Sequence, residues 1–492
     1  MNQGWEQREF AAAQLGDKRL EGRLKLIARR LAEDPQRSVA SAMRGASEIH
    51  AAYRFFDNNK TTAEKIFAAH QEAIVSRASQ HRRVLLVQDT TELDYTSKKQ
   101  LQGTGPLAEG PRSGLFCHDH LVLSEEGLAL GVWGADFNAR DPEEIGKAQW
   151  RKQRPIEQKE SWRWMEGYKK ACELARRLGS DTQVVSCADR EGDIFEIFDQ
   201  WANGLESDSG AAHWLVRSCQ NRCLESEQEQ EQKPLPKIHD LVASQEVGGW
   251  ISLEVCARVQ NKKVKGGSRV KSKRSKRKAQ LEVRWTSHKL KPPLRKASKL
   301  KPVEVRVVRA TEKNPPPDEP PIDWILLTSL PVDSLADALE IIRLYSLRWQ
   351  IEVFHRVLKT GCQVEELQIK EVKRLKVAVA LYMVVAWRVL YLMKLGRLAA
   401  HLPCDLFVEP DEWKALGAVC LGPDKTPKTA PSIGWFVRCV GRLGGHPGRK
   451  SDGEPGAQTL WRGMTRLRDF TLAWRVIMQG EAAFDFESVD LA

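Results

Sequence analysis

The chain lacks any apolar run of the ~18 residues that a transmembrane helix needs. Its longest candidate, VAVALYMVVAW at 377–387, is too short and continues into a charged helical sequence that favours burial. The opening residues, MNQGWEQREF, contain no apolar core of a secretion signal. We therefore expect no membrane partner and a cytoplasmic location, associated with the nucleoid in a bacterium.

Cysteine is sparse and scattered, with 10 in 492 residues, which does not fit the disulfide framework of a small secreted domain. Cys219 and Cys223 are the closest pair. Neither a second pair nor well-placed histidines accompany them, so a zinc site is disfavoured. His118 and His120 alternate along an expected strand, where a structural role is favoured over a metal-binding one.

What the sequence does contain is positive charge, with a formal net charge of +12. This balance fits a polyanionic partner, either nucleic acid or an acidic membrane surface, although a mildly basic soluble protein would also have it. The hydrophobic fraction of 41% is enough for sizeable cores. Nucleic acid is the favoured partner.

The order of expected elements indicates the fold class. VLLVQD at 84–89 is typical of a buried strand, and 120–137 of a hairpin. A helix at 161–180, the strand TQVVSCAD, a helix from EGDIF and the strand AAHWLVRS follow. This order predicts an α/β protein with a ribonuclease-H-like core, in which sites gather at strand ends.

Three domains are expected from composition. Residues 1–75 are polar, arginine-rich and helical, residues 76–375 carry the α/β core, and residues 376–492 are helical and rich in arginine and tryptophan. Alternating sequences at 222–323 predict an antiparallel β-domain inserted into the core. Within it lies a basic loop at 262–278, interpreted as a phosphate-contacting arm or a solubilising loop.

Three carboxylates have the pattern that a two-metal nuclease needs. Asp89 ends VLLVQD, Asp189 ends VVSCAD, and Glu352 lies in the expected helix LYSLRWQIEVFHRVLKTG. Two divalent ions roughly 4 Å apart activate the nucleophile and relieve charge on the leaving oxygen. Oxygen ligands suit Mg²⁺. We expect two Mg²⁺ ions, for which Mn²⁺ can substitute, with Asp89 bridging both.

The sequence around Glu352 has a second regularity. Tyr345, Arg348, Glu352 and Lys359 follow the spacing Y-x2-R-x3-E-x6-K. At about 100° per residue, one continuous helix would carry all four on a stripe roughly 60° wide. Arginine can bind a phosphate with two parallel hydrogen bonds, whereas lysine acts as a point charge. A salt-bridged surface helix is the alternative interpretation.

With these motifs the chain resembles the DDE transposases of the insertion-sequence-four family, of the transposon-five type with the Y-R-E-K signature. The resemblance extends over nearly the whole chain and is carried by LGDKRLEGRL, GASEIHAAYRFFDN, QDTT, SCADREGDIF, LVRS, DWILLTSLPVDSLADAL, YSLRWQIEVFHRVLKTG and RLGG.

The resemblance implies roles for individual residues. Asp89, Asp189 and Glu352 match the catalytic, metal-binding triad. The resemblance also implies three roles in DNA binding: holding the terminal phosphates and the hairpinned end, stacking on a flipped base, and belonging to the module that reads the transposon end. The residues implied in these roles are Tyr345, Arg348, Lys359, Arg217, Trp324, Arg19 and Arg23. The N-terminal base-reading residues match only in part, so a different end sequence is expected.

The resulting prediction is a cut-and-paste DNA transposase. The resemblance implies that it binds transposon ends, cleaves them by metal-dependent hydrolysis through a hairpin, and joins the 3′ ends to target DNA. Residues 1–75 would bind the end and residues 376–492 would dimerise, as a homodimer on double-stranded DNA with each active site cutting the partner's end. A ribonuclease-H-like nuclease without strand transfer and a catalytically silent DNA-binding regulator remain alternatives.

Overall fold

The computed structural model describes residues 4–36, 38–107, 110–144, 156–206, 210–225, 236–255, 258–263, 269–294 and 300–480. The chain forms two compact units. Unit 1 comprises Met1–Lys159 and Trp349–Ala492, and unit 2 comprises Glu160–Arg348. Both terminal helical segments fall in unit 1, so this grouping differs from the three domains expected from sequence, whose boundaries stay predictions.

The sheet of unit 1 is antiparallel and centres on β3 (Ser113–Ser124). β3 pairs with β1 (Arg83–Asp94) and with β4 (Ala129–Asn138), and its first residues pair with the short β2 (Gly105–Pro106). The hairpin expected at 120–137 is therefore confirmed as β3 and β4, although β3 begins earlier.

Asp89 lies inside β1 and not at its end, so the expected strand end at this residue is wrong. The apolar run 84–87 is buried as expected, but the ladder continues beyond it, with Thr90–Asp94 pairing with residues 118–114 of β3. The pairing with β3 keeps this polar segment extended. A hydrophobicity pattern cannot reveal such a partner, because strand preference depends on the neighbouring strand.

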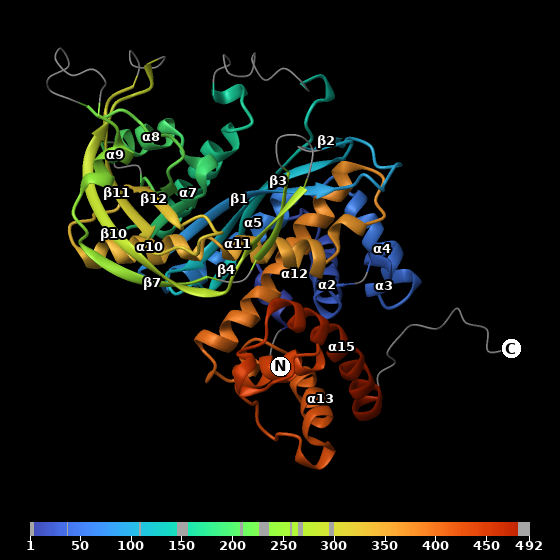
Figure 1. Cartoon of the computed structure of the whole chain (residues 1–492). Coiled ribbons are helices and arrows are strands. Elements are labelled where there is room, and N and C mark those ends of the chain that lie inside the picture. The colour runs from blue at the N-terminus through green and yellow to red at the C-terminus, as the bar shows by residue number, and fades with distance from the viewer. Residues whose placement is uncertain are drawn as a thin grey trace. The chain divides into compact units, whose positions relative to one another are not determined.

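The helices of unit 1 surround α12 (Val372–Leu398), which is buried on nearly every side. N-terminal helices α2, α4 and α5 and C-terminal helices α14 and α15 contact it, and Figure 1 shows the blue and red helices beside the long orange one. By length and mean hydropathy α12 could cross a membrane, so the expectation that this apolar segment is too short is wrong, but 89% of its most apolar window is buried. The burial expected for this segment is confirmed.

The other helices of unit 1 are short to medium in length. Their bounds are α1 Trp5–Glu9, α2 Lys18–Glu33, α3 Val39–Ala42, α4 Ala46–Asp57, α5 Ala63–Ala78, α11 Gln350–Arg356, η5 Val357–Gly361, α13 Pro410–Leu421, α14 Ile433–Leu443 and α15 Ala457–Gln479. Short 3₁₀ turns are η1 Pro142–Glu144, η2 Ile156–Gln158, η6 Val364–Glu366, η7 Cys404–Leu406, η8 Pro423–Lys425 and η9 Lys450–Asp452. Thr62 is the N-cap of α5, where its side chain accepts a hydrogen bond from the Lys65 N–H.

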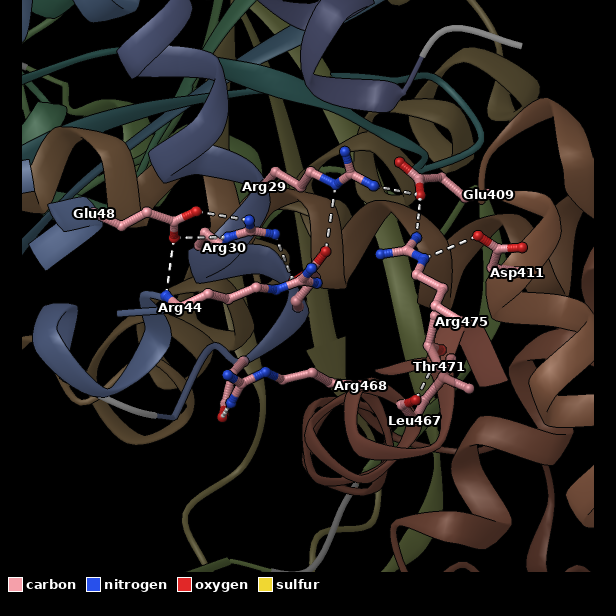
Figure 2. A network of polar contacts seen from close by, with 12 residues as sticks. Arg29, Arg30, Arg44, Glu48, Glu409, Asp411, Leu467, Arg468, Thr471 and Arg475 are labelled. Atoms are coloured by element: carbon pink, nitrogen blue, oxygen red, sulfur yellow. Dashed lines mark hydrogen bonds and ion pairs between the residues drawn. The ribbon is translucent and has the colours of Figure 1, made fainter. Parts of the chain in front are cut away.

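Ion pairs tie the N-terminal and C-terminal helices of unit 1 together (Figure 2). Arg29 of α2 and Arg475 of α15 both bind one carboxylate oxygen of Glu409, at 2.8 and 2.7 Å. Arg468 of α15 pairs with Asp34 at 2.7 Å, and both side chains are almost wholly buried. Removing one partner of a buried ion pair costs about 3–5 kcal/mol, since it strands the other charge.

Unit 2 contains a mixed sheet in the order β5-β6-β12-β11-β10-β7. β5 and β6 run parallel and are joined by α8, and the other neighbours are antiparallel. The strands are β5 Gln183–Ala188, β6 His213–Arg217, β7 Gly249–Val255, β10 Arg277–Leu290, β11 Val303–Glu312 and β12 Asp323–Thr328. The helical elements are α7 Trp162–Leu178, η3 Arg190–Gly192, α8 Phe195–Glu206, α9 Ile238–Ser244 and α10 Leu335–Leu347.

The segment 222–323 is antiparallel as expected, but its strands β7, β10 and β11 extend the sheet of β5 and β6. The basic loop expected at 262–278 is partly wrong. Its ends belong to strands, because β8 (Arg258–Lys263) pairs with β9 (Arg269–Arg274) in a hairpin, and residues 264–268 lie outside the described residues. Backbone pairing stabilises these charged strands without the apolar alternation by which strands are recognised.

A buried polar cluster joins α1 to α5 and β4. The Glu9 carboxylate accepts two hydrogen bonds from Arg77, both 2.9 Å long, and one of 2.5 Å from His70 Nδ1. His70 Nε2 accepts the Val132 N–H at 3.0 Å, so one neutral tautomer satisfies both contacts. Burial would raise the pKa of Glu9, but Arg77 and His70 lower it to about 2. Burial also lowers the pKa of His70.

We predict that acid destabilises unit 1 through this cluster. Both folded-state pKa values lie below the unfolded ones, so the stability is present above pH 6.5 and is lost as the pH falls toward about 2. For Glu9 the contribution is roughly 3 kcal/mol. Urea unfolding midpoints at pH 7, 5 and 3 should fall less steeply for Glu9→Gln than for wild type. The exposed Glu143→Gln is the control, and equal slopes for all three proteins would contradict the assignment.

Candidate active site

In unit 1, β1 and β3 set the position of Asp89. Asp89 is half-buried and lies directly opposite Asp119 in the antiparallel register. Directly opposed residues point to the same face of a sheet. The Thr90 N–H donates to Asp89 Oδ1 at 2.7 Å, which fixes the carboxylate over this face.

Helix α11 brings Glu352 to the same face, because α11 contacts β1. One turn beyond Glu352, His355 Nε2 donates to Asp119 Oδ1 at 2.6 Å. Burial alone would lower the pKa of His355, but the charges of Asp119 and Asp89 and the hydrogen bond to Asp119 raise it above its usual value. Since His355 is close to Asp89 and one turn from Glu352, the structure gathers both predicted carboxylates of unit 1.

The continuous helical stripe expected through Tyr345 and Lys359 is wrong. α10 ends at Leu347, α11 begins at Gln350, and residues 357–361 form a π-helical turn closed by a 2.7 Å hydrogen bond from the Cys362 N–H to the Val357 carbonyl. Tyr345 and Arg348 therefore belong to unit 2, and Glu352 and Lys359 to unit 1. The segment contains neither proline nor glycine before Gly361, so no local signal marks the break. π-turns are frequent at functional sites.

Lys359 contacts β1 directly. Its Nζ donates to the Glu92 carbonyl at 2.7 Å and pairs with Glu365 at 3.0 Å. The predicted phosphate-binding lysine is thus half-buried between the π-turn and β1, two turns along from Glu352.

In unit 2, Asp189 directly follows β5, as expected for a site at a strand end. It is the N-cap of η3, where its Oδ1 accepts the Glu191 N–H at 2.8 Å. Its charge raises the pKa of Cys187, which burial raises to about 12, while Arg348 opposes this shift. The charges of Asp189 and Arg348 therefore both act on the Cys187 thiol.

Aromatic and cationic groups of unit 2 surround this carboxylate. The rings of Trp324 and Tyr345 meet edge to face with centroids 5.4 Å apart. Burial raises the pKa of Tyr345 to about 12, although Arg348 and Arg217 lower it. The Tyr345 hydroxyl therefore stays protonated at neutral pH and can donate a hydrogen bond.

Arg217 is in an environment that disfavours its charge. Burial and the nearby cations Arg190 and Arg348 lower its pKa, with Tyr345 and Asp323 offsetting part of the effect. Its Nη2 donates to the Asp323 carbonyl at 2.9 Å. The three guanidinium charges of Arg217, Arg190 and Arg348 repel one another, and a bound anion would reduce that repulsion.

Arg19 and Arg23 lie one turn apart on α2, so they project from one side of that helix. Arg19 is exposed and Arg23 is half-buried. Both belong to unit 1, at the solvent-facing part of the N-terminal helices.

Sequence reasoning missed three residues that this geometry emphasises: Asp119, His355 and Arg190. Asp119 lies between His118 and His120, the two residues of this strand that were weighed as metal ligands from the sequence. Those histidines bond to Thr90 Oγ1 and Gln88, and to the Gly134 carbonyl. An ionisable residue in the middle of an apolar strand was the signal that could have revealed Asp119.

The donor set fits a hard divalent cation, since carboxylate oxygens are the ligands that Mg²⁺ and Mn²⁺ prefer. Asp89, Asp189 and Glu352 are all half-buried, which leaves part of each side chain accessible. The described residues contain no group of three His, Cys, Asp or Glu side chains placed to hold a metal ion. Asp89 and Glu352 belong to unit 1, and Asp189 belongs to unit 2.

Three family models match parts of the chain. They are described as transposase DNA-binding, over residues 2–61, transposase DDE domain, over 247–387, and transposase Tn5 dimerisation domain, over 384–478. The DDE match includes Glu352, and the DNA-binding match includes Arg19 and Arg23; Asp89 and Asp189 lie outside all three.

These matches define the class of protein as an enzyme that cleaves DNA and transfers its strands. More particularly, the chain is a DNA transposase with a DDE domain, which binds DNA, forms a homodimer and depends on divalent metal.

We predict that Asp89→Asn and Asp189→Asn abolish DNA cleavage without unfolding the protein. Asparagine keeps the acceptor oxygen for the Thr90 and Glu191 N–H groups and caps a helix as well as aspartate does. Removing one metal-binding charge should lower the nicking rate by roughly 10³-fold. Thermal melting and nicking of labelled duplex DNA measure the two effects. The exposed Asp181→Asn should behave as wild type, and cleavage by either site variant at the wild-type rate would refute its role.

Proposed function

We propose that this chain is a cut-and-paste transposase of the insertion-sequence-four family, in which Asp89, Asp189 and Glu352 are the catalytic carboxylates. The observation that carries the proposal is the site in unit 2, where the Trp324 and Tyr345 rings meet and the charges of Asp189, Arg348 and Arg217 all act on the Tyr345 hydroxyl. A carboxylate for metal, cations for phosphate and an aromatic ring for a base are the parts that processing a DNA end requires.

The proposed reaction is a series of displacements at phosphorus. Water first attacks the phosphodiester at the transposon end, and the departing oxygen becomes a free 3′-hydroxyl. That hydroxyl attacks the opposite strand, expelling the flanking DNA and closing a hairpin. A second water opens the hairpin, and the regenerated 3′-hydroxyl attacks target DNA and joins to it.

All four displacements exchange one phosphorus–oxygen bond for another, so a single set of residues can serve each of them. Asp89, Asp189 and Glu352 would hold two Mg²⁺ ions, for which Mn²⁺ can substitute. Bound there, the ions would lower the pKa of the attacking oxygen and neutralise charge on the leaving oxygen.

The surrounding side chains position the DNA in this proposal. Arg348 binds a terminal phosphate through two parallel hydrogen bonds, and Lys359 adds a point charge. Tyr345, protonated at neutral pH, donates its hydroxyl to a phosphate oxygen. Arg217 lies against the hairpin, where an anion relieves its repulsion from Arg190.

Trp324 receives an extruded base in the hairpin step. Extruding a base costs a few kcal/mol, and stacking on an aromatic ring returns about 1–3 kcal/mol. Its half-buried ring is held at one edge by Tyr345.

The remaining assignments follow from the same proposal. Arg19 and Arg23 on α2 contact the double-stranded transposon end, and a second copy of the chain bridges the other end, so that each active site cuts the end held mainly by its partner. The protein acts in the cytoplasm of a bacterium, at the nucleoid.

The test uses the DNA that flanks the reading frame, which should carry inverted repeats bounded by short direct duplications. Purified protein, labelled duplexes of these repeats, a supercoiled target and Mg²⁺ should yield nicked ends, hairpins and joined products in that order. Broken ends that never join the target would instead indicate a nuclease without strand transfer. Binding without any cleavage would indicate a silent regulator.

We predict that Trp324→Ala slows hairpin formation by roughly 10–100-fold, because about 1–3 kcal/mol of stacking is lost. First-strand nicking, which needs no extruded base, should change less than threefold. Trp324→Phe is the matched variant, since it keeps a ring and should recover much of the hairpin rate. Gel-resolved time courses on an end duplex distinguish the steps, and equal slowing of both steps in Trp324→Ala would contradict base stacking.

A further inference from the structure

Asp119 is an unusual residue for its position. It lies in the middle of β3, its side chain is wholly buried, and its Oδ2 has no hydrogen-bond partner among the described residues. Burying a carboxylate is costly even when it is paired, so an apolar residue would suit a strand of this kind better. The functional assignments made above do not use Asp119.

The neighbours of Asp119 are the residues of the active site. Its opposite partner in the ladder is Asp89, and like charges at directly opposed positions repel. His355 donates to Asp119 Oδ1 at 2.6 Å, and its pKa also responds to Asp89. One imidazole thus lies close to the catalytic carboxylate and to the buried one.

The same imidazole belongs to the helix that carries Glu352. Residues three apart on a helix project from the same side, so the bond from His355 to Asp119 fixes both the rotation of α11 and its height above the sheet. Further along, Lys359 Nζ is bonded to the Glu92 carbonyl of β1 at 2.7 Å. The segment carrying Glu352 is therefore attached to this sheet at two points, one on β3 and one on β1.

We propose that Asp119 and His355 are a positioning pair that sets the separation of the Asp89 and Glu352 carboxylates, and through it the affinity of the site for its divalent metal. The proposal rests on the assignment of Asp89 and Glu352 as metal ligands. Neither residue of the pair touches the metal in this scheme; they act through the ligands. Groups that orient ligands from outside the coordination shell commonly change metal affinity by 10–100-fold.

The test replaces the pair by two leucines, Asp119→Leu with His355→Leu. Replacing both partners strands no buried charge, and such replacements often preserve folding. The expected result is a 10–100-fold increase in the Mn²⁺ concentration for half-maximal nicking by the full-length protein. Mn²⁺ binding to the protein, measured from the free-ion electron paramagnetic resonance signal, should weaken by the same factor. Binding of an end duplex without metal should be unchanged.

The matched control is Asp34→Asn, which alters the equally buried ion pair with Arg468 in the same unit. It should lower the thermal midpoint without changing the Mn²⁺ dependence. His355→Gln is the conservative variant, because the glutamine amide can still donate a hydrogen bond to Asp119. The Mn²⁺ concentration for half-maximal nicking should rise no more than about threefold in this variant, compared with the 10–100-fold change that ligand-orienting groups commonly cause. This variant also provides the test if the double-leucine protein does not fold.

A wild-type Mn²⁺ dependence in the double-leucine variant would overturn the proposal, and so would a His355→Gln protein that needs at least tenfold more Mn²⁺. An equal shift in Asp34→Asn would show a general effect of lost stability and would also overturn it. Failure of the underlying assignment gives a different result, in which Asp89→Asn itself binds Mn²⁺ like wild type.

Discussion

The contact between α11 and β1 is the constraint on which the active-site residues of unit 1 depend. β1 precedes most of the chain and α11 follows more than two-thirds of it, so no local preference can bring them together. Two hydrogen bonds hold the segment 350–361 to this sheet, one from His355 to Asp119 of β3 and one from Lys359 to the Glu92 carbonyl of β1. Soon after them, α12 is enclosed by helices from both ends of the chain, which anchors the segment that carries Glu352.

Charge is arranged differently in the two units. Unit 1 has two half-buried acids, Asp89 and Glu352, and carboxylate oxygens suit a divalent cation. Unit 2 has Asp189 and several guanidinium groups, and burial together with the nearby charges of Arg190 and Arg348 lowers the pKa of Arg217. Guanidinium groups close to one another repel in the absence of an anion and are stabilised when an anion binds. This is the property expected of a surface that binds a DNA end.

Much of the local structure could be predicted from the sequence. The hairpin of β3 and β4, the helix α7 and the strand end at Asp189 were all predicted. Strand alternation, caps and glycine at positive φ act over a few residues and need no distant partner. The errors occur where the extent of a strand or helix depends on a segment that is distant in the sequence. β1 runs past Asp89 because β3 continues beside it, and the helix through Tyr345 breaks before Glu352 without any local breaker.

The sequence by itself determined the chemical inventory of this protein: the carboxylates Asp89, Asp189 and Glu352 within apolar or helical motifs, the Y-R-E-K spacing, a positive net charge and an apolar helical segment that begins at residue 377. Only the tertiary structure decided that Asp119 stands opposite Asp89, that His355 spans from the Glu352 helix to that buried acid, and that Trp324 meets Tyr345 edge to face. Residue identity and short periodicities specify what each element can form, whereas contacts between remote segments depend on how the whole chain buries its apolar surface, which no short window contains.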